Sequence, residues 1–262
     1  MDWILHNLDR DSFVKYPKIN KLRRLLIAKF CKKIFVTDEV IKKEILKGVI
    51  PFDFKKNKLV AISFGENLKT KVSDFDYDVK SIISQLKEGC DDLRIGLCAT
   101  AYSEKCFHIW ELEKLLNIIN YERKTVHVIF ICKIPREDLK DAYFQRLAAR
   151  TDLTFLPHGG EVNEYYLSEY IDFIYRALSD VSVPMSIYNA CSAKLPILTH
   201  PVGVSKCLIE DTGIGFCIDL ERNPDINLFF SFLDTWDCRS SKHFLAIRNW
   251  RSSSKALFWS EN

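Results

Sequence analysis

The fold class of this chain is decided by residues 161–199, which read EVNEYYLSEYIDFIYRALSDVSVPMSIYNACSAKLPILT. The pattern predicts a helix, a buried strand over 172–175, a loop, a second helix that begins at Pro184, and a buried strand over 195–199. Two apolar strands joined through a helix indicate a parallel sheet. In such a sheet, the loop that leaves a strand and enters a helix is where phosphorylated ligands bind.

Short apolar runs alternate with helical patterns along the rest of the chain. The expected strands are 3–6, 34–37, 59–63, 94–98, 126–132, 153–156, 172–175, 195–199 and 215–218. This alternation predicts an α/β fold of parallel strands and crossover helices. Pro51, Gly65 and a charged run that follows them indicate a boundary between two domains. We expect an amino-terminal domain with its linker over 1–66, a second domain over 67–237, and a final helix over 238–262 that crosses back over the body.

The composition limits the classes of protein that the chain can belong to. Its 262 residues with 47% hydrophobic content can bury one large core or two modest ones, which excludes a mostly disordered chain. No run of 18 apolar residues is present, so no membrane span is predicted. The nine cysteines form no CxxC pair and follow no signal peptide, which favours reduced thiols in a cytoplasmic protein. The net charge of +3 is small, and we expect no nucleic-acid partner.

Basic residues are concentrated near the amino terminus. Residues 15–48 hold eleven Lys or Arg and three acidic residues. The helix expected over 18–33 places Leu22, Leu25, Leu26 and Phe30 between its charges, which is typical of a helix that lies on an anionic membrane. A solvated helix face would show the same pattern. The first interpretation predicts a cytoplasmic protein that associates peripherally with the inner membrane face.

The first candidate loop follows the strand over 94–98. It reads ATAYSEK and leads into a helix over 106–120, whose apolar side is expected to carry Trp110, Leu112, Leu115 and Leu116. Lys105 would stand at the amino end of that helix, where a lysine can bind a phosphate; an ordinary solvated lysine is the alternative. The loop lacks the P-loop spacing, so a nucleoside triphosphatase is not predicted.

The second candidate loop is LTFLPHGGEVNE, residues 153–164. Gly159 and Gly160 would let the backbone turn closely past a flat ligand, or simply past its neighbours. His158 has no second histidine or cysteine at ligand spacing. We therefore expect His158 to be structural or to face solvent, and we predict no metal site.

The third candidate loop, RALSDVSVP, leads into the helix at Pro184. The backbone N–H groups of Met185 and Ser186 would point at an anion in the crevice. Ser182, Ser186 and Asn189 could add polar contacts to a phosphate or a ribose. Helix capping would explain one of the serines equally well. The inward face of this helix is expected to carry Ile187, Ala190 and Cys191.

These three loops, in this order, resemble the carboxyl-terminal nucleotide-sugar-binding domain of GT-B glycosyltransferases, in particular the bacterial polysaccharide and lipopolysaccharide group. The resemblance extends to 1–66, where His6 and Asn7 match the family's histidine-asparagine or histidine-aspartate pair and Gly65 matches its glycine turn before the linker. It implies a Rossmann-like donor domain beside part of a second Rossmann-like domain.

The resemblance also implies a function. It indicates a hexosyltransferase-like enzyme that moves a sugar from a nucleotide-diphosphate donor to a glycan or lipid-linked acceptor, in polysaccharide or cell-surface glycan synthesis, without a cofactor. The matching residues would have these roles: His6 approaches the transferred sugar as the catalytic residue, Lys105, Met185 and Ser186 hold the diphosphate, Gly159 and Val162 bound the base, and Asn189 bonds the ribose. Ser182, from the third loop, would add a polar contact to the donor.

Some positions depart from the family's pattern. Asn189 stands where a glutamate is usual, Val181 where an acid is common, with Asp180 beside it, and Thr100 where an arginine is common. The first part of the amino-terminal domain also has no counterpart in the chain. These departures favour an alternative: a catalytically silent nucleotide-sugar-binding or scaffolding subunit, a truncated glycosyltransferase whose activity is lost. A second polypeptide that completes the amino-terminal domain would restore an active enzyme.

Overall fold

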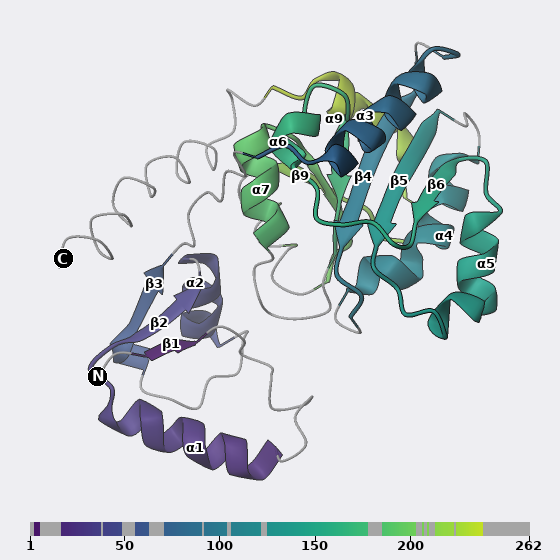
Figure 1. Ribbon diagram of the computed structural model, residues 1–262. Coiled ribbons are helices and arrows are strands. Elements are labelled where there is room, and N and C mark those ends of the chain that lie inside the picture. The colour runs from purple at the N-terminus through teal and green to yellow at the C-terminus, as the bar shows by residue number, and fades with distance from the viewer. Residues whose placement is uncertain are drawn as a thin grey trace.

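The structure is a computed structural model of the chain. It describes residues 3–5, 17–37, 39–48, 56–62, 71–90, 92–103, 106–121, 125–177, 185–202, 206, 209, 213–222 and 224–237. Within these residues the strands form two parallel sheets, one of three strands and one of six (Figure 1). The predicted α/β fold class with parallel strands is confirmed.

The three-stranded sheet has the order β1-β2-β3 and is built from β1 (Trp3–Leu5), β2 (Ile34–Thr37) and β3 (Leu59–Ile62). Helix α1 (Pro17–Phe30) connects β1 to β2, and α2 (Glu39–Lys47) with the short 3-10 helix η2 (Lys56–Lys58) connects β2 to β3. Ile34 and Val36 of β2 are fully buried, as are Ile41 and Ile45 of α2. Burial of these aliphatic side chains holds the helix on the sheet.

The six-stranded sheet has the order β6-β5-β4-β7-β8-β9. Its strands are β4 (Arg94–Thr100), β5 (Val126–Cys132), β6 (Leu153–Leu156), β7 (Phe173–Tyr175), β8 (Ile197–Thr199) and β9 (Gly215–Cys217). Every residue of β5 is buried, as expected for a strand covered on both faces. The order places β4 and β7 side by side at the centre, where the chain direction across the sheet reverses. Ligands of open parallel sheets bind at that reversal.

Helices cover both faces of the six-stranded sheet (Figure 1). One core cluster joins the sheet to α3 (Asp74–Lys87), α6 (Glu164–Leu167) and α7 (Met185–Ala193). The other joins it to α4 (Phe107–Ile119), α5 (Ala142–Ala148) and α9 (Ile226–Asp234). A short 3-10 helix, η3 (Asp138–Lys140), precedes α5. The apolar faces that the sequence pattern predicts are thus buried against the sheet from two sides.

A buried carboxylate ties α3 to the second candidate loop. Ser73 and Asp76 form a reciprocal capping box at the start of α3. Asp76 also accepts a hydrogen bond of 2.7 Å from the backbone N–H of Asn163, whose side chain in turn caps α6. Asp76 therefore fixes the loop that leads from β6 into α6.

All nine predicted strands are present, with ends that differ from the prediction by at most two residues. The helix predicted over 106–120 is α4, but Trp110 does not lie on its buried side: its exposed fraction is 41%, whereas Leu112, Leu115 and Leu116 are fully buried. The prediction for Trp110 was wrong because the tryptophan packs at the helix margin, beside Tyr102, Tyr143 and Phe144. The helix predicted over 238–262 lies outside the described residues, and the domain boundaries stay a prediction.

A search of the helices in the described ranges finds none that is both long and apolar enough to cross a membrane.

Candidate functional site

The carboxyl ends of β4, β7 and β8 meet at one edge of the six-stranded sheet, because the three strands are parallel neighbours. Thr100 ends β4, Arg176 follows β7 and His200 follows β8. Helices α4 and α7 lead away from this edge on opposite faces of the sheet. We call this region the carboxyl edge.

Buried polar atoms without a partner are concentrated at the carboxyl edge. Four such side-chain atoms occur within the described ranges: His108 Nε2, Arg176 Nε, Ser186 Oγ and Asn189 Oδ1. His108 lies in the first turn of α4, Arg176 directly follows β7, and Ser186 and Asn189 lie in the first half of α7. Buried polar groups in folded proteins are nearly always hydrogen-bonded, so unsatisfied ones need an explanation. Four of them at one edge of a parallel sheet indicate a ligand site.

Helix α7 supplies two of the four atoms. Ser186 is 7% exposed, and its Oγ accepts from and donates to no described residue. Asn189 stands one turn further along the same face, and its Nδ2 donates to Glu164 Oε1 at 3.3 Å. That bond leaves Asn189 Oδ1 as a buried acceptor without a donor. Sequence reasoning named both residues of α7 but missed Glu164, which comes from α6.

His108 presents a lone pair at the same edge. Its Nδ1 lies 2.5 Å from the carbonyl oxygen of Ala177 and must therefore carry the proton and donate. Burial, together with the nearby charge of Arg176, lowers the pKa of His108 to about 3, so the ring is neutral at pH 7. The Nε2 atom is then an acceptor with no donor among the described residues.

His200 and Tyr175 form a closed pair beside His108. His200 Nδ1 donates to the carbonyl oxygen of Ile218 at 3.0 Å, and its Nε2 accepts a hydrogen bond from the hydroxyl of Tyr175. Burial lowers the pKa of His200 to about 4 and raises that of Tyr175. Both side chains are satisfied, so this neutral pair holds the ends of β7, β8 and β9 together and needs no ligand. Sequence reasoning did not name His108, Tyr175, Arg176 or His200, although the position of Tyr175 and Arg176 at the end of a buried strand was a usable signal.

The second candidate loop is packed tightly. A side chain at Gly159 would place its Cβ atom 2.5 Å from Ile131 Cγ2 and 2.7 Å from Phe75 Cζ, so these two side chains would have to shift. Val162 is 2% exposed and belongs to the core cluster that joins α3, α6 and α7 to the sheet. His158 is exposed, which confirms that it faces solvent. Gly159 and Val162 therefore lie on the side of the loop that packs against the protein interior.

Three predicted site residues, His6, Lys105 and Ser182, lie outside the described residues. The structure describes Met185 as the first residue of α7, so its backbone stands at the helix terminus as predicted. Of the predicted site residues, the structure brings Met185, Ser186 and Asn189 together on one helix. Within the described ranges, no group of three or more His, Cys, Asp or Glu is arranged to hold a metal ion.

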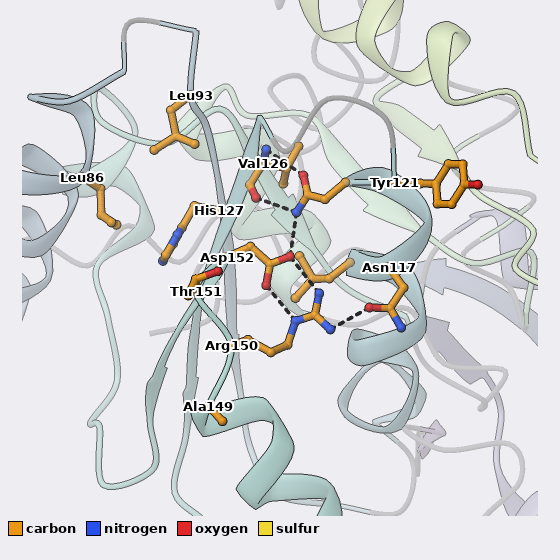
Figure 2. A pocket seen from close by; sticks show the side chains of 12 residues that line it. Leu86, Leu93, Asn117, Tyr121, Val126, His127, Ala149, Arg150, Thr151 and Asp152 are labelled. Carbon is orange, nitrogen blue, oxygen red and sulfur yellow. Dashed lines mark hydrogen bonds and ion pairs between the residues drawn. The ribbon is translucent and has the colours of Figure 1, made fainter.

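A pocket of about 750 Å³ opens at the opposite end of the sheet, where β5 and β6 begin (Figure 2). Its polar side chains bond one another: Asp152 accepts from Arg150 Nε at 2.7 Å and from Asn120 at 2.9 Å, and Arg150 donates to Asn117 at 2.7 Å. Asn120 also exchanges two hydrogen bonds with the backbone of Val126. This network satisfies these polar groups without a ligand. We assign the pocket a structural role, which is to tie the end of α4 to the starts of β5 and β6.

No family model and no curated protein matches the sequence. Solved structures do match. HepE from Anabaena, in complex with UDP and glucose, is 14% identical with a TM-score of 0.68, and the match covers 100% of this chain and 71% of HepE. A glycosyltransferase from Rickettsia africae is 15% identical, with a TM-score of 0.58 and coverage of 88% and 64%.

A UDP-forming α,α-trehalose-phosphate synthase from Burkholderia vietnamiensis is 10% identical, with a TM-score of 0.61 and coverage of 98% and 65%. Across these three matches, the chain spans between 64% and 71% of the length of the protein that it resembles.

Proposed function

We propose that this chain, which has the GT-B glycosyltransferase fold, binds a nucleotide sugar at its carboxyl edge and takes part in sugar transfer. The fold confirms the resemblance that the sequence indicated. The observation that carries the proposal is the set of four unpartnered buried polar atoms at the carboxyl edge. HepE, which shares the fold, is in complex with UDP-glucose in a further structure. The proposed reaction is transfer of a sugar from a nucleotide diphosphate to a glycan or lipid-linked acceptor, in polysaccharide or cell-surface glycan synthesis.

The start of α7 is suited to the diphosphate. Its first backbone N–H groups have no partner within the helix and carry the positive end of the helix dipole, and Ser186 Oγ adds a donor. In transfer, the bond between the anomeric carbon and the diphosphate oxygen breaks, and the diphosphate keeps the electron pair. The acceptor hydroxyl oxygen forms the new bond to the anomeric carbon, and its proton passes to the leaving diphosphate or to solvent. Donors fixed at the start of α7 would stabilise the charge that develops on the leaving diphosphate.

Asn189 is suited to the ribose. Glu164 bonds the amide of Asn189 and orients it. A carboxylate therefore stands beside position 189, where the resembled family usually has a glutamate. Asn189 Oδ1 would accept a ribose hydroxyl. Lys105 and Ser182 as further diphosphate contacts, Gly159 and Val162 as the boundary of the base, and His6 beside the transferred sugar stay proposals that rest on the sequence resemblance. We propose no cofactor.

A binding and turnover experiment tests the function. Calorimetric titration with UDP, GDP and ADP is expected to give micromolar affinity for at least one diphosphate and much weaker affinity for the matching nucleoside. Release of free sugar from the corresponding nucleotide sugar, followed by chromatography, then measures turnover. If none of the three diphosphates binds, the proposed function is wrong. If one binds without hydrolysis or transfer, alone or with a second polypeptide that completes the three-stranded sheet, the chain is the catalytically silent subunit.

Helix α1 favours a second property, attachment to an anionic membrane. Five large apolar side chains on α1 are exposed to solvent: Ile19 65%, Leu22 59%, Leu25 38%, Leu26 51% and Phe30 71%. The spacing of three or four residues places four of them, Ile19, Leu22, Leu26 and Phe30, in one stripe along the helix. Exposed lysines stand on and after the helix, namely Lys18, Lys29, Lys32 and Lys33. We propose that the stripe enters the headgroup region and that the lysines pair with anionic lipids. The attached protein would then reach a lipid-linked acceptor at the inner membrane face.

Replacing both Leu22 and Leu26 with Gln is expected to weaken binding to vesicles rich in anionic lipid by at least about tenfold, because each leucine loses part of an apolar contribution of about 1.5 to 3 kcal/mol. Vesicle flotation measures the effect, and raised salt should weaken wild-type binding. Leu46→Gln is the matched control, since Leu46 is 50% exposed on α2. Equal flotation of all variants, or a double variant that changes only the oligomeric state, would remove the membrane proposal in favour of a protein partner.

A further inference from the structure

Arg176 stands at the centre of the carboxyl edge. It directly follows β7, which lies between β4 and β8 in the sheet. Its Nη1 donates to the carbonyl oxygen of Ala99 at 3.1 Å, so the side chain reaches from β7 across to the end of β4. Arg176 therefore lies between the strand that leads to α4 and the strand that leads to α7.

The charge of Arg176 has no carboxylate partner among the described residues, which sets it apart from other arginines of the same sheet and its helices. Arg94 pairs with Asp172 at 3.1 Å, Arg146 with Glu113 at 3.0 Å, and Arg150 with Asp152 at 2.7 Å. Among the described residues Arg176 bonds only the neutral carbonyl of Ala99, and its Nε is buried without an acceptor. Arg176 as a whole is half-buried, but its buried N–H donor without an acceptor is costly, and an anion at Nε would satisfy it.

The other unpartnered atoms help to define the missing anion. Ser186 Oγ and the first N–H groups of α7 are donors at the same edge. His108 Nε2 is an acceptor beside Arg176, because His108 Nδ1 donates to the carbonyl oxygen of Ala177, the residue that follows Arg176. An anion with several acceptor oxygens that also carries hydroxyl groups satisfies both kinds of atom. A sugar diphosphate has this chemistry.

We infer that Arg176 binds the diphosphate of the donor, with Nε–H donating to a phosphate oxygen while Nη1 stays on Ala99. This inference rests on the proposed function. It gives the site a positive charge at the end of β4, where the sequence has Thr100 rather than a basic residue. The arginine comes instead from the neighbouring strand. It would hold the diphosphate for transfer and stabilise the negative charge that the diphosphate gains as the sugar leaves.

Replacing Arg176 with Met and with Lys tests the inference by calorimetry with UDP, GDP or ADP, whichever the wild-type protein binds, and with the matching nucleoside. Arg176→Met is expected to lower diphosphate affinity by about 30-fold to 100-fold, which lies within the range of a hydrogen bond to a charged group, and to change nucleoside affinity less than about twofold. Arg176→Lys keeps the charge but loses Nε–H, and a loss of about tenfold is expected. Arg222→Met is the matched control, because Arg222 is exposed and pairs with Asp219.

The outcomes separate the inference from the proposed function. If Arg176→Met binds the diphosphate as tightly as the wild-type protein does, the inference is overturned and the proposed function stands. Equal losses for diphosphate and nucleoside would show a merely structural arginine and would also overturn it. A wild-type protein that binds none of the three diphosphates would overturn both. If Arg176→Met does not fold, as judged by its thermal melt, the selective loss in Arg176→Lys decides the question.

Discussion

Replacing Ser186 with Asp is expected to abolish binding of a nucleoside diphosphate, with a loss of affinity of at least about 100-fold. Ser186 is buried in the first turn of α7, and its Oγ has no partner in the described part of the chain. A carboxylate there would occupy the place of the incoming phosphate and repel it, and like charges brought together at a binding site cost several kcal/mol. The fold is expected to tolerate the change, because a negative charge is favourable near a helix amino terminus.

Calorimetry with the diphosphate and its nucleoside measures this effect, and a thermal melt confirms folding. The nucleoside is expected to keep most of its affinity, since it brings no charge to α7. Ser81→Asp is the matched control: it adds the same charge at an exposed position of α3. Diphosphate affinity in Ser186→Asp that is within a few-fold of the control would place the phosphate elsewhere and contradict the assignment of α7.

Gly215→Ala is expected to cause the largest loss of stability, although alanine adds only a methyl group. Gly215 of β9 pairs with Ile197 of β8, and a Cβ atom added there would lie 2.1 Å from the carbonyl oxygen of Ile197, 2.9 Å from its carbonyl carbon and 3.0 Å from its nitrogen. All three are backbone atoms, so no side chain can turn away. Strand β9 would have to move off β8, and we expect Gly215→Ala to cost about 3 kcal/mol or more.

Gly213→Ala is the control for Gly215→Ala. Gly213 has a φ of +67° with nothing within 4 Å of the added atom, so the change introduces backbone strain without a collision. A cost of about 1 to 2 kcal/mol is expected for a left-handed residue with a side chain. Urea unfolding of both variants measures the difference. Equal costs would mean that the close approach of β8 and β9 relaxes easily, and the collision argument would be wrong.

The local pattern was enough to predict the strands and the faces of several helices. Alternation of apolar runs with helical periods determined all nine strands, because burial on two faces leaves a near-continuous apolar signature. The same reasoning identified Ile187, Ala190 and Cys191 as the inward face of α7, and all three are buried. It failed at Trp110, since a residue at the margin of an apolar stripe packs or stays exposed according to neighbours that the pattern does not contain.

The candidate site was only partly predictable, for a related reason. Ser186 and Asn189 were named because a helix start after a buried strand is a local feature. Glu164 and Arg176 were not named, because their importance comes from contacts between different elements: Glu164 with Asn189 of α7, and Arg176 with Ala99 at the end of β4. No local pattern shows that an acid on one helix stands beside an amide on another.

The sequence by itself determined the α/β class and the strands, because periodicity acts over a few neighbouring residues, and it predicted the loop after 172–175 as a candidate ligand site. The tertiary structure alone decided which polar groups are buried and which of them lack a partner. Burial and pairing depend on segments far apart in the chain, as when Arg176 meets the backbone of Ala99 and no carboxylate among the described residues. The four atoms that support the proposed function become buried without a partner only when the strands are assembled side by side.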